Sequence, residues 1–408
     1  MKPLGPIPAG FGAEDGELVV AGQRASELVA GAGDTPLFVY SGELVRRRVE
    51  ALRAAMPASL KVHYAVKANP YRPLLELMRD LTDGFDIASG GELELALAAG
   101  QDARRISFAG PGKRDAELQL AISHGVTLNL ESAAEARRAL AIAERLGVQP
   151  RLAIRVNPDF ELRGSGMKMG GGAKPFGIDQ ERVPALAREL IGAGAEWRGL
   201  HIFTGSQALD AEAIAETQGN VLDLAARLTA QIGAPLTHLN MGGGFGIPYF
   251  HGDQPVDAAM VGERLAGRFS ALPDELQATE FAIELGRYLV GEAGVYLTRI
   301  VDRKESHGHV FLVTDGGLHH QLAASGNFGT VVRRNYPAAI ANRFGAEAEE
   351  EASIVGCLCT PLDRLADQAA LPRADVGDLV AVFCAGAYGA SASPSAFLGQ
   401  GPAREMLV

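Results

Sequence analysis

A lysine that follows a short apolar segment is the first residue in this sequence that could do chemistry. Residues 60–66 read LKVHYAV and predict a β-strand, and alternation puts His63, Ala65 and Lys67 on one face. A neutral lysine amine attacks aldehydes, and burial at the end of an apolar strand would favour that neutral form. The alternative is a lysine just past a strand end whose charged head reaches solvent.

A run of glycines follows another predicted strand, LTHLNM (236–241). Gly242, Gly243 and Gly244 carry no side chains, so their backbone N–H groups can approach an anion such as a phosphate. A flexible loop is an equally good interpretation of this run. The glycines therefore predict a phosphate site only in combination with other groups.

Polar groups also close three further predicted strands. The sequence ELGR places Glu284 and Arg287 together, although such residues often form a surface ion pair. His201 is followed by the small donors of TGS, including Ser206, but a lone histidine is more often structural. Asp86 precedes SGGE, which would equally serve as an ordinary helix N-terminus.

The elements that must position these residues repeat one rhythm, a short β-rich run followed by a helical stretch rich in Ala, Leu and Glu. Eight alternating units favour a closed parallel (β/α)₈ barrel, with an open doubly wound sheet as the alternative. In such barrels the working groups lie at the C-terminal ends of the strands. The predicted strands are 60–66, 84–88, 104–109, 126–130, 151–156, 198–203, 236–241 and 280–285.

The rhythm changes beyond residue 290, where strand-like segments follow one another with little helical pattern. We expect two domains: a barrel over residues 36–288 and a mainly β domain formed by residues 1–35 and 289–408. Together, the barrel rim would offer an amine, a phosphate cradle, a carboxylate and an imidazole plane. That combination matches the needs of pyridoxal phosphate, with Glu284 as the candidate partner of its pyridine nitrogen.

The motifs HYAVKANP, FDIASGGE, GLHIFTGSQ, NMGGGFG, ELGR, GCLCTPLD and GAYG occur in this order along the chain. The ordered set resembles the fold-type III pyridoxal-phosphate-dependent decarboxylases, the family of diaminopimelate, ornithine and arginine decarboxylases. The resemblance spans nearly the whole chain. It implies the decarboxylation of an amino acid, a (β/α)₈ barrel and a second domain that is a β-barrel.

The resemblance also implies roles for individual residues. Lys67 would hold the cofactor as a Schiff base, His201 would stack on its ring, and Glu284 would meet the pyridine nitrogen. Phosphate ligands would come from the glycine run and the remaining rim residues. Cofactor-binding residues so implied are Lys67, Asp86, His201, Ser206, Gly242, Gly243, Gly244, Glu284, Arg287 and Tyr388.

In this family the active site forms between two protomers, each lending a cysteine-containing loop to the other, so a homodimer is implied. In GCLCTPLD the resemblance makes Cys359 a general acid near Cα. Substrate contacts would come from Arg287, Cys359, Thr360 and Asp363.

The sequence departs from its relatives where the far end of the substrate would be held. Relatives that use free diamino acids commonly carry an acidic residue after the catalytic cysteine, but Thr360 stands here. The segment VVRRNYPAAIAN also lacks a clear match to the residues that diaminopimelate enzymes use, although Arg333 and Arg334 are nearby. A glycine-rich, basic loop at 163–177, with Arg163, Lys168 and Lys174, could contact an acidic or phosphopantetheine-tethered substrate or form a mobile lid.

These departures, with a likeness to the exosortase-associated and carrier-protein-acting subgroups, favour a non-standard or carrier-bound substrate. A meso-diaminopimelate decarboxylase is the alternative. A racemase sharing the cofactor and barrel would not need the Cys359 and Asp363 motif. A regulator without cofactor would be expected to lose Lys67, His201 and Glu284, which are all present.

Composition restricts the remaining possibilities. A formal charge of −11 disfavours nucleic-acid binding, and no apolar stretch is long enough to cross a membrane. The Pro- and Gly-broken opening segment does not resemble a secretory signal, so we expect a cytoplasmic protein. The three cysteines, Cys357, Cys359 and Cys384, predict neither disulfides nor a metal site.

Overall fold

The computed structural model describes residues 1–326 and 333–408, which divide into two compact units. The barrel unit comprises residues 49–246 and 256–286. The β unit comprises residues 1–48, 247–255 and 287–408. Helix α2 (Gly42–Ala55) contributes residues to both units. None of the helices in the described part combines the length and apolarity needed to span a membrane.

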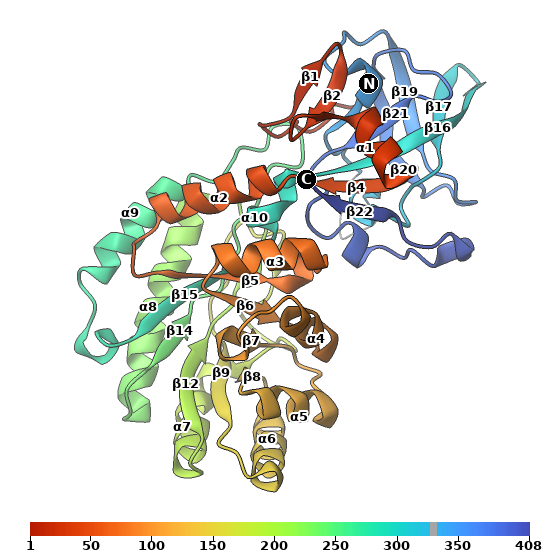
Figure 1. The fold of residues 1–408 in the computed structure, drawn as a ribbon. Helices are drawn as coiled ribbons and strands as arrows, with labels where there is room; N and C mark the ends of the chain where they lie inside the picture. Colours follow the sequence, from red (N-terminus) through yellow and green to blue (C-terminus); the bar gives the residue numbers. More distant parts are fainter. Residues whose placement is uncertain (327–332) are drawn as a thin grey trace. The chain divides into compact units, whose positions relative to one another are not determined.

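Parallel strands close into a barrel in the barrel unit, with helices around the outside (Figure 1). Strand β15 pairs with β5, and β8 pairs with β9, so the ring has no open edge. The closed barrel is confirmed and the open sheet is excluded. Each of the predicted strands is present, as β5 (Lys61–Ala65), β6 (Gly84–Ile87), β7 (Ile106–Phe108), β8 (Thr127–Leu130), β9 (Arg151–Asn157), β12 (Glu196–His201), β14 (His238–Asn240) and β15 (Glu280–Leu285).

The helices of the barrel unit begin and end where local chemistry dictates. The side chain of Ser132 accepts the N–H of Glu135 at 3.1 Å and caps one N-terminus. Gly147, with φ +65°, ends the same helix in a left-handed conformation that other residues rarely adopt. The helices are α3 (Arg72–Leu81), α4 (Gly90–Ala98), α5 (Asp115–His124), α6 (Ala133–Leu146), α7 (Val183–Gly192), α8 (Ala211–Ile232) and α9 (Ala258–Phe269).

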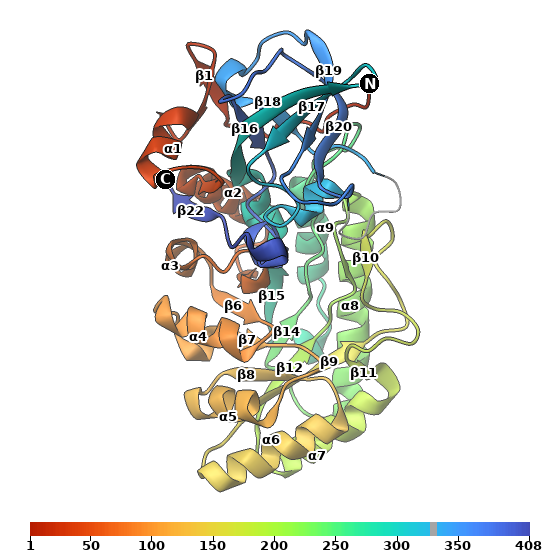
Figure 2. The same cartoon turned by 90° about the vertical axis from the view of Figure 1, so that its right-hand side faces the viewer.

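The β unit contains an eight-stranded sheet and a separate three-stranded one (Figure 2). The larger sheet consists of β4 (Leu37–Tyr40), β16 (Gly294–Ser306), β17 (His309–Thr314), β18 (Ala338–Ile340), β19 (Glu350–Val355), β20 (Arg364–Leu371), β21 (Leu379–Val382) and β22 (Arg404–Leu407). The smaller one is formed by β1 (Gly12–Glu14), β2 (Glu17–Val20) and β3 (Gln23–Arg24), after which α1 (Ala25–Ala32) begins. The prediction of a mainly β second domain is confirmed.

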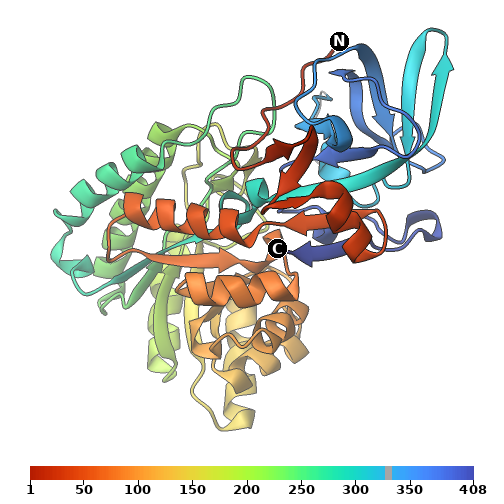
Figure 3. The same ribbon diagram turned by 45° about the horizontal axis from the view of Figure 1, so that its top comes forward.

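Strand β4 joins distant parts of the sequence. It pairs antiparallel with β16 and parallel with β22, which lie side by side with it in Figure 3. Residues 37–40 therefore belong to the sheet of the β unit, whereas the sequence analysis began the barrel at residue 36. The reason is that LFVY is buried on both faces and pairs along its whole length, as a central strand does.

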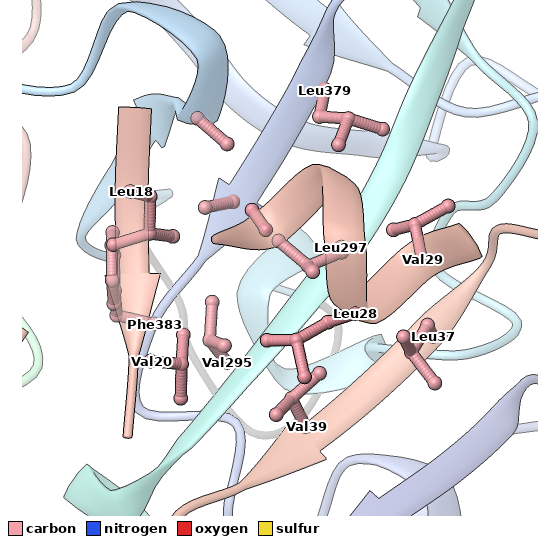
Figure 4. Close-up of a cluster of buried hydrophobic side chains, with 13 residues drawn as sticks. Leu18, Val20, Leu28, Val29, Leu37, Val39, Val295, Leu297, Leu379 and Phe383 are labelled. Atoms are coloured by element: carbon pink, nitrogen blue, oxygen red, sulfur yellow. The ribbon is translucent and has the colours of Figure 1, made fainter. Parts of the chain in front are cut away.

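A hydrophobic cluster stabilises the β unit (Figure 4). Leu18 and Leu28 from the N-terminal segment pack with Val39, Val295 and Phe383. Each of these side chains is at most 2% exposed, so each contributes about 1.5–3 kcal/mol of burial free energy. The cluster explains why the first residues of the chain and the C-terminal segments form one unit.

Candidate active site

A cavity of about 180 Å³ lies at the C-terminal ends of the barrel strands. Four of the residues predicted from the sequence line it: Lys67, Asp86, His201 and Glu284. The other lining residues are Ala65, Ile87, Ala88, Ala109, Gly110, Pro111, Arg155, Met169, Phe176 and Phe203. The fold thus brings together an amine, an imidazole and two carboxylates from four strands.

Lys67 lies in a single 3₁₀ turn, η1 (Val66–Ala68), directly after β5. Its side chain is exposed, so the expectation that an apolar strand would bury it is wrong: the chain leaves the strand at Ala65, before the lysine. Its Nζ lies 5.3 Å from the centre of the Phe203 ring. In the described part of the chain, Lys67 makes no hydrogen bond or ion pair, so the amine is available to a ligand.

Glu284 and His201 form a buried pair on facing strands. The Glu284 Oε2 atom accepts hydrogen bonds from His201 Nε2 at 2.9 Å and from Asn240 Nδ2 at 3.1 Å. Burial would raise the pKa of Glu284, but the neighbouring His201, Lys67 and Arg155 outweigh it and lower that pKa. The carboxylate is therefore held ionised at the wall of the cavity.

Two buried polar atoms of predicted site residues have no partner among the described residues. They are Nδ1 of His201, whose residue is 1% exposed, and Oγ of Ser206 in β13 (Gly205–Ser206). Buried polar atoms in folded proteins are almost always hydrogen-bonded. These two atoms are therefore suited to a polar ligand.

The glycine run after β14 is required by close packing. A Cβ atom on Gly243 would lie 1.9 Å from the carbonyl oxygen of Glu284. Gly242 and Gly244 have φ values of +70° and +93°, which other residues rarely adopt. Asn240, which the sequence analysis did not single out, fixes the start of the run by accepting the Gly242 N–H at 2.9 Å. Backbone groups here can approach an anion closely.

Asp86 lines the cavity from β6 and is 7% exposed. Its Oδ2 atom accepts a hydrogen bond from Nδ1 of His63 at 3.1 Å. The following SGGE segment caps α4 in the ordinary way, because Ser89 accepts the N–H of Glu92 at 3.1 Å. Asp86 thus lines the cavity, whereas Ser89 caps the helix.

Arg155 is a further charged residue at the cavity that the sequence analysis missed. It donates to Glu131 Oε1 at 2.8 Å, and its guanidinium lies 4.9 Å from the centre of the Phe176 ring. Alternation along RLAIRVN puts Arg155 on the inward face of β9, which is the signal that could have found it. Met169 and Phe176 come from a loop, where no periodicity exists to reveal them.

The loop 158–177 is anchored at several points. The N–H groups of Met169 and Gly170 donate to the carbonyl of Thr204 at 3.0 and 3.2 Å. Glu131 Oε2 accepts the N–H of Gly177 at 2.6 Å. These bonds hold the loop as one wall of the cavity.

The remaining predicted site residues lie in the β unit: Arg287, Cys359, Thr360, Asp363 and Tyr388. Arg287, at the start of α10 (Arg287–Val290), donates to the Tyr249 hydroxyl at 2.6 Å and lies 4.6 Å from the Tyr388 ring centre. Burial raises the pKa of Tyr249 to about 12, despite the nearby Arg287. Tyr388 has φ +55°, an uncommon conformation for a tyrosine. The guanidinium of Arg287 therefore contacts two aromatic rings, those of Tyr249 and Tyr388.

The GCLCTPLD segment forms a turn organised by Asp363. Its carboxylate accepts the N–H groups of Leu318 at 2.6 Å and Leu358 at 2.9 Å, and it is 2% exposed. Cys359 is exposed in this turn, and Thr360 is half-buried. Because backbone donors engage both oxygens of Asp363, the geometry favours a role in shaping the turn that presents Cys359.

Two arginines near this turn have partners of their own. Arg334 lies 3.8 Å from the Phe250 ring centre, and Arg333 donates to the Leu362 carbonyl at 3.4 Å. The first residues of the VVRRNYP segment, 331 and 332, lie outside the described residues.

Comparison with known proteins decides the family. Residues 43–291 match the family described as pyridoxal-dependent decarboxylase, pyridoxal binding domain. The chain belongs to this family. The enzyme is 35% identical to the L-glutamyl-[BtrI acyl-carrier protein] decarboxylase of Niallia circulans, over 92% of this chain and 89% of the relative. It is 34% identical to the diaminopimelate decarboxylase of Archaeoglobus fulgidus, over 93% and 89%.

Solved structures agree with this membership. The diaminopimelate decarboxylase of M. jannaschii superposes with a TM-score of 0.87 at 26% identity, covering 97% of the enzyme and 92% of that chain. AQ1208 from Aquifex aeolicus superposes with a TM-score of 0.83 at 32% identity, over 98% and 92%. The enzyme is a pyridoxal-phosphate-dependent amino-acid decarboxylase, and the residues around its cavity fit that cofactor: a free amine, an ionised carboxylate, an unpartnered imidazole nitrogen and a glycine run.

Proposed function

We propose that this decarboxylase acts on an amino acid whose side chain is tethered to an acyl carrier protein. The observation that carries the proposal is the basic, glycine-rich loop 163–177, whose Met169 and Phe176 line the cavity beside Lys67. The relative from Niallia circulans, which is named for a glutamyl carrier-protein substrate, supports it.

The loop offers the two surfaces that a tethered substrate needs. Met169 and Phe176 face the cavity and provide apolar contact. Arg163, whose side chain is 78% exposed, lies 3.5 Å from the exposed Glu216 in a surface ion pair, and the half-buried Lys174 adds a second positive charge. A phosphopantetheine linker carries a phosphate and an apolar arm, so both kinds of surface are complementary to it.

The chemistry of the reaction decides how the substrate is attached. Decarboxylation at Cα uses the α-amine and the α-carboxylate, so a carrier must be joined through the side chain. The distal end is then an uncharged thioester, which needs no ionic partner. Thr360 occupies the position where relatives that use free diamino acids carry an acidic residue, and this fits an uncharged distal end.

Within the barrel unit we assign the cofactor contacts to the residues predicted from the sequence. Bound pyridoxal phosphate supplies an aldehyde for the substrate amine and a protonated ring that accepts the electrons released at Cα. Lys67 would hold the aldehyde, Glu284 the ring nitrogen and His201 a ring face. Asp86 would support the same site, and Ser206 with Gly242, Gly243 and Gly244 would bind the phosphate.

The remaining roles are proposed from the family resemblance. They make Arg287 and Tyr388 phosphate ligands, Cys359 the donor of a proton to Cα, and Thr360 a substrate contact. For Asp363 the resemblance implies a substrate contact as well, and its backbone hydrogen bonds favour an indirect one, through the turn that it shapes. A homodimer in the cytoplasm belongs to the same proposal. Sedimentation of the purified protein with and without cofactor tests the oligomeric state.

The test measures carbon dioxide release from four substrates by the enzyme loaded with cofactor. They are glutamate linked through its side-chain carboxyl to a phosphopantetheinyl carrier protein, the same thioester on pantetheine alone, free L-glutamate and free meso-diaminopimelate. We expect the highest kcat/KM for the carrier-linked substrate and the lowest for the free amino acids. Faster turnover of meso-diaminopimelate would instead favour the alternative that several relatives at 30–35% identity represent.

A charge reversal in the loop separates carrier binding from chemistry. Arg163→Glu should lower kcat/KM for the carrier-linked substrate roughly three- to tenfold, with little change for the pantetheine thioester. Arg72→Glu reverses another exposed, ion-paired arginine, on α3, whose side chain is 64% exposed, and serves as the matched control. Equal losses on both thioesters would contradict a carrier contact at Arg163.

A further inference from the structure

A buried histidine, His63, lies in β5 four residues before Lys67. His63 is 8% exposed, and its Nδ1 atom lies 3.1 Å from Oδ2 of Asp86. Because a carboxylate only accepts, Nδ1 carries the proton in this bond. The decarboxylase chemistry described above gives His63 no task.

Asp86 is in turn connected to the carboxylate at the cavity. Its Oδ1 atom accepts from Asn240 Nδ2 at 3.4 Å, and the same Nδ2 lies 3.1 Å from Glu284 Oε2. The orientation of the Asn240 amide is unambiguous, because its Oδ1 accepts the backbone N–H of Gly242 at 2.9 Å. A hydrogen-bonded chain therefore runs from His63 through Asp86 and Asn240 to Glu284.

The other side of His63 lines a second cavity. This cavity, of about 240 Å³, lies at the N-terminal ends of the strands, opposite to the cavity of Lys67. Lys61, Arg104 and Glu280 line it with side chains that are 42%, 68% and 53% exposed, so it opens to solvent. His63 can thus exchange a proton with water without passing the cofactor cavity.

We propose that His63 is a positioning residue for Glu284. Through Asp86 and Asn240 it orients the carboxylate that meets the cofactor's ring nitrogen, and its own proton tunes how strongly that carboxylate holds the ring. The inference rests on the proposed role of Glu284 and extends it to the opposite end of the barrel.

The charges around His63 support this role. Burial lowers the pKa of His63, but the negative charges of Asp86, Glu284 and Asp83 raise it by more, so the net shift is upward. The ring of His238 lies 5.9 Å away between centroids, and burial, with His63 next, lowers its pKa to about 3. The titratable and charged groups facing His63 are Lys61 on β5, Asp83 and Asp86 at β6, Arg104 and Arg105 before β7, Arg198 on β12, His238 on β14, and Glu280 and Glu284 on β15.

Coupling of this kind is reciprocal. A proton on His63 and the protonated ring of the cofactor both draw on the negative charge of Asp86 and Glu284, so each weakens the binding of the other. Cofactor binding should therefore lower the pH midpoint of His63, by about 0.5 pH unit, which corresponds to roughly a threefold change in cofactor Kd.

The experiment follows the ¹³C signals of labelled histidines in the full protein against pH, with and without pyridoxal phosphate and with no substrate present. The His63 signal is assigned from the spectrum of His63→Gln. We expect its midpoint to fall when the cofactor binds, and the fall to shrink in Asn240→Ala, which cuts the chain. An unchanged midpoint in the wild type overturns the proposal but leaves decarboxylation itself untouched.

Cofactor affinity supplies an independent readout. Relative to wild type, the Kd of His63→Gln for pyridoxal phosphate should change about threefold between pH 5.5 and pH 8.5, because the variant lacks the His63 proton that is coupled to the cofactor. His238→Gln, which alters the neighbouring ring outside the chain, should follow the wild type at both values. A parallel pH dependence of wild type and His63→Gln would count against the relay.

Discussion

Both ends of the barrel contain ion pairs, but the C-terminal ends also carry a lysine that has none in the described chain. At the N-terminal ends of the strands, charges pair with one another: Glu196 lies 3.2 Å from Arg151 and 3.3 Å from Arg198. At the C-terminal ends, Lys67 makes no hydrogen bond or ion pair within the described chain. There, buried atoms of His201 and Ser206 also have no partner among the described residues.

This difference separates stability from function. The charges at the N-terminal ends lie in ion pairs with one another, although Nε of Arg198 has no hydrogen-bond partner among the described residues. The groups without partners at the C-terminal ends can form hydrogen bonds and ion pairs with a bound ligand. Where polar groups are left without partners is thus a better guide to the site than where they are merely abundant.

The largest effect should come from the amine at the C-terminal end. Lys67→Ala should lower decarboxylation by roughly 10⁴-fold or more, since a covalent group is removed. The absorbance band of the bound cofactor should be lost as well. Lys61→Ala, at the N-terminal end of β5, should keep that band. If Lys67→Ala retained the band, another amine would hold the cofactor.

The next effect concerns the glycine run. Gly243→Ala would place a Cβ 1.9 Å from a backbone oxygen, so the loop must shift by about 1 Å, and catalysis should fall by roughly 10²-fold. Cofactor affinity, measured by fluorescence titration, should fall with it. Gly192→Ala is the matched control, because nothing lies within 4 Å of its new Cβ.

Lys113, which follows β7, is a buried and paired counterpart to the exposed Lys67. Lys113 is 3% exposed and pairs with the buried Glu135 at 2.7 Å, and burial lowers its pKa although Glu135 opposes the shift. Lys113→Ala should reduce the free energy of unfolding by about 3–5 kcal/mol, because Glu135 is left buried without a partner.

Chemical denaturation measures this loss, and the double variant Lys113→Met with Glu135→Leu should recover most of it. Lys67→Ala should change the free energy of unfolding without cofactor by no more than about 0.5 kcal/mol. Equal losses at Lys67 and Lys113 would contradict the division between the two lysines.

The smallest effect lies at the N-terminal end. The pKa of His238 is lowered to about 3 by burial and by His63, whereas an unfolded histidine titrates near 6.5. Between these values the unfolded chain binds a proton that the folded one does not, so stability falls as pH falls, by up to about 1.4 kcal/mol per pH unit. Melting temperatures at pH 7 and pH 5 should differ less for His238→Gln than for wild type. A larger difference in the variant would show that His238 is charged in the fold.

Much of the fold could be predicted because its signals are local. Alternation and helical periodicity revealed each barrel strand to within a few residues. The same alternation predicted Lys67 on the face of His63, but the strand ends at Ala65 and Lys67 lies in the turn that follows. Strand β4 was assigned to the barrel segment because nothing in LFVY tells which sheet it joins. Its partners, β16 and β22, lie more than 250 residues away in the sequence.

The candidate site divides in the same way. Sequence motifs indicated Lys67, Asp86, His201 and Glu284, and the cavity is lined by all four. Asn240, Arg155 and the loop residues Met169 and Phe176 were missed, because their importance arises only from what lies next to them. The burial expected for Lys67 was wrong for a related reason, since the point where a chain leaves a strand depends on the surrounding sheet.

The sequence by itself determined which chemical groups this enzyme has and the order in which the strands present them, because residue type and periodicity are properties of short segments. Only the tertiary structure decided which groups are paired and which are left without a partner. Burial and hydrogen bonding depend on residues far apart in the chain, as the path from His63 to Glu284 illustrates. That path joins β5, β6, β14 and β15, and no local pattern in the sequence contains it.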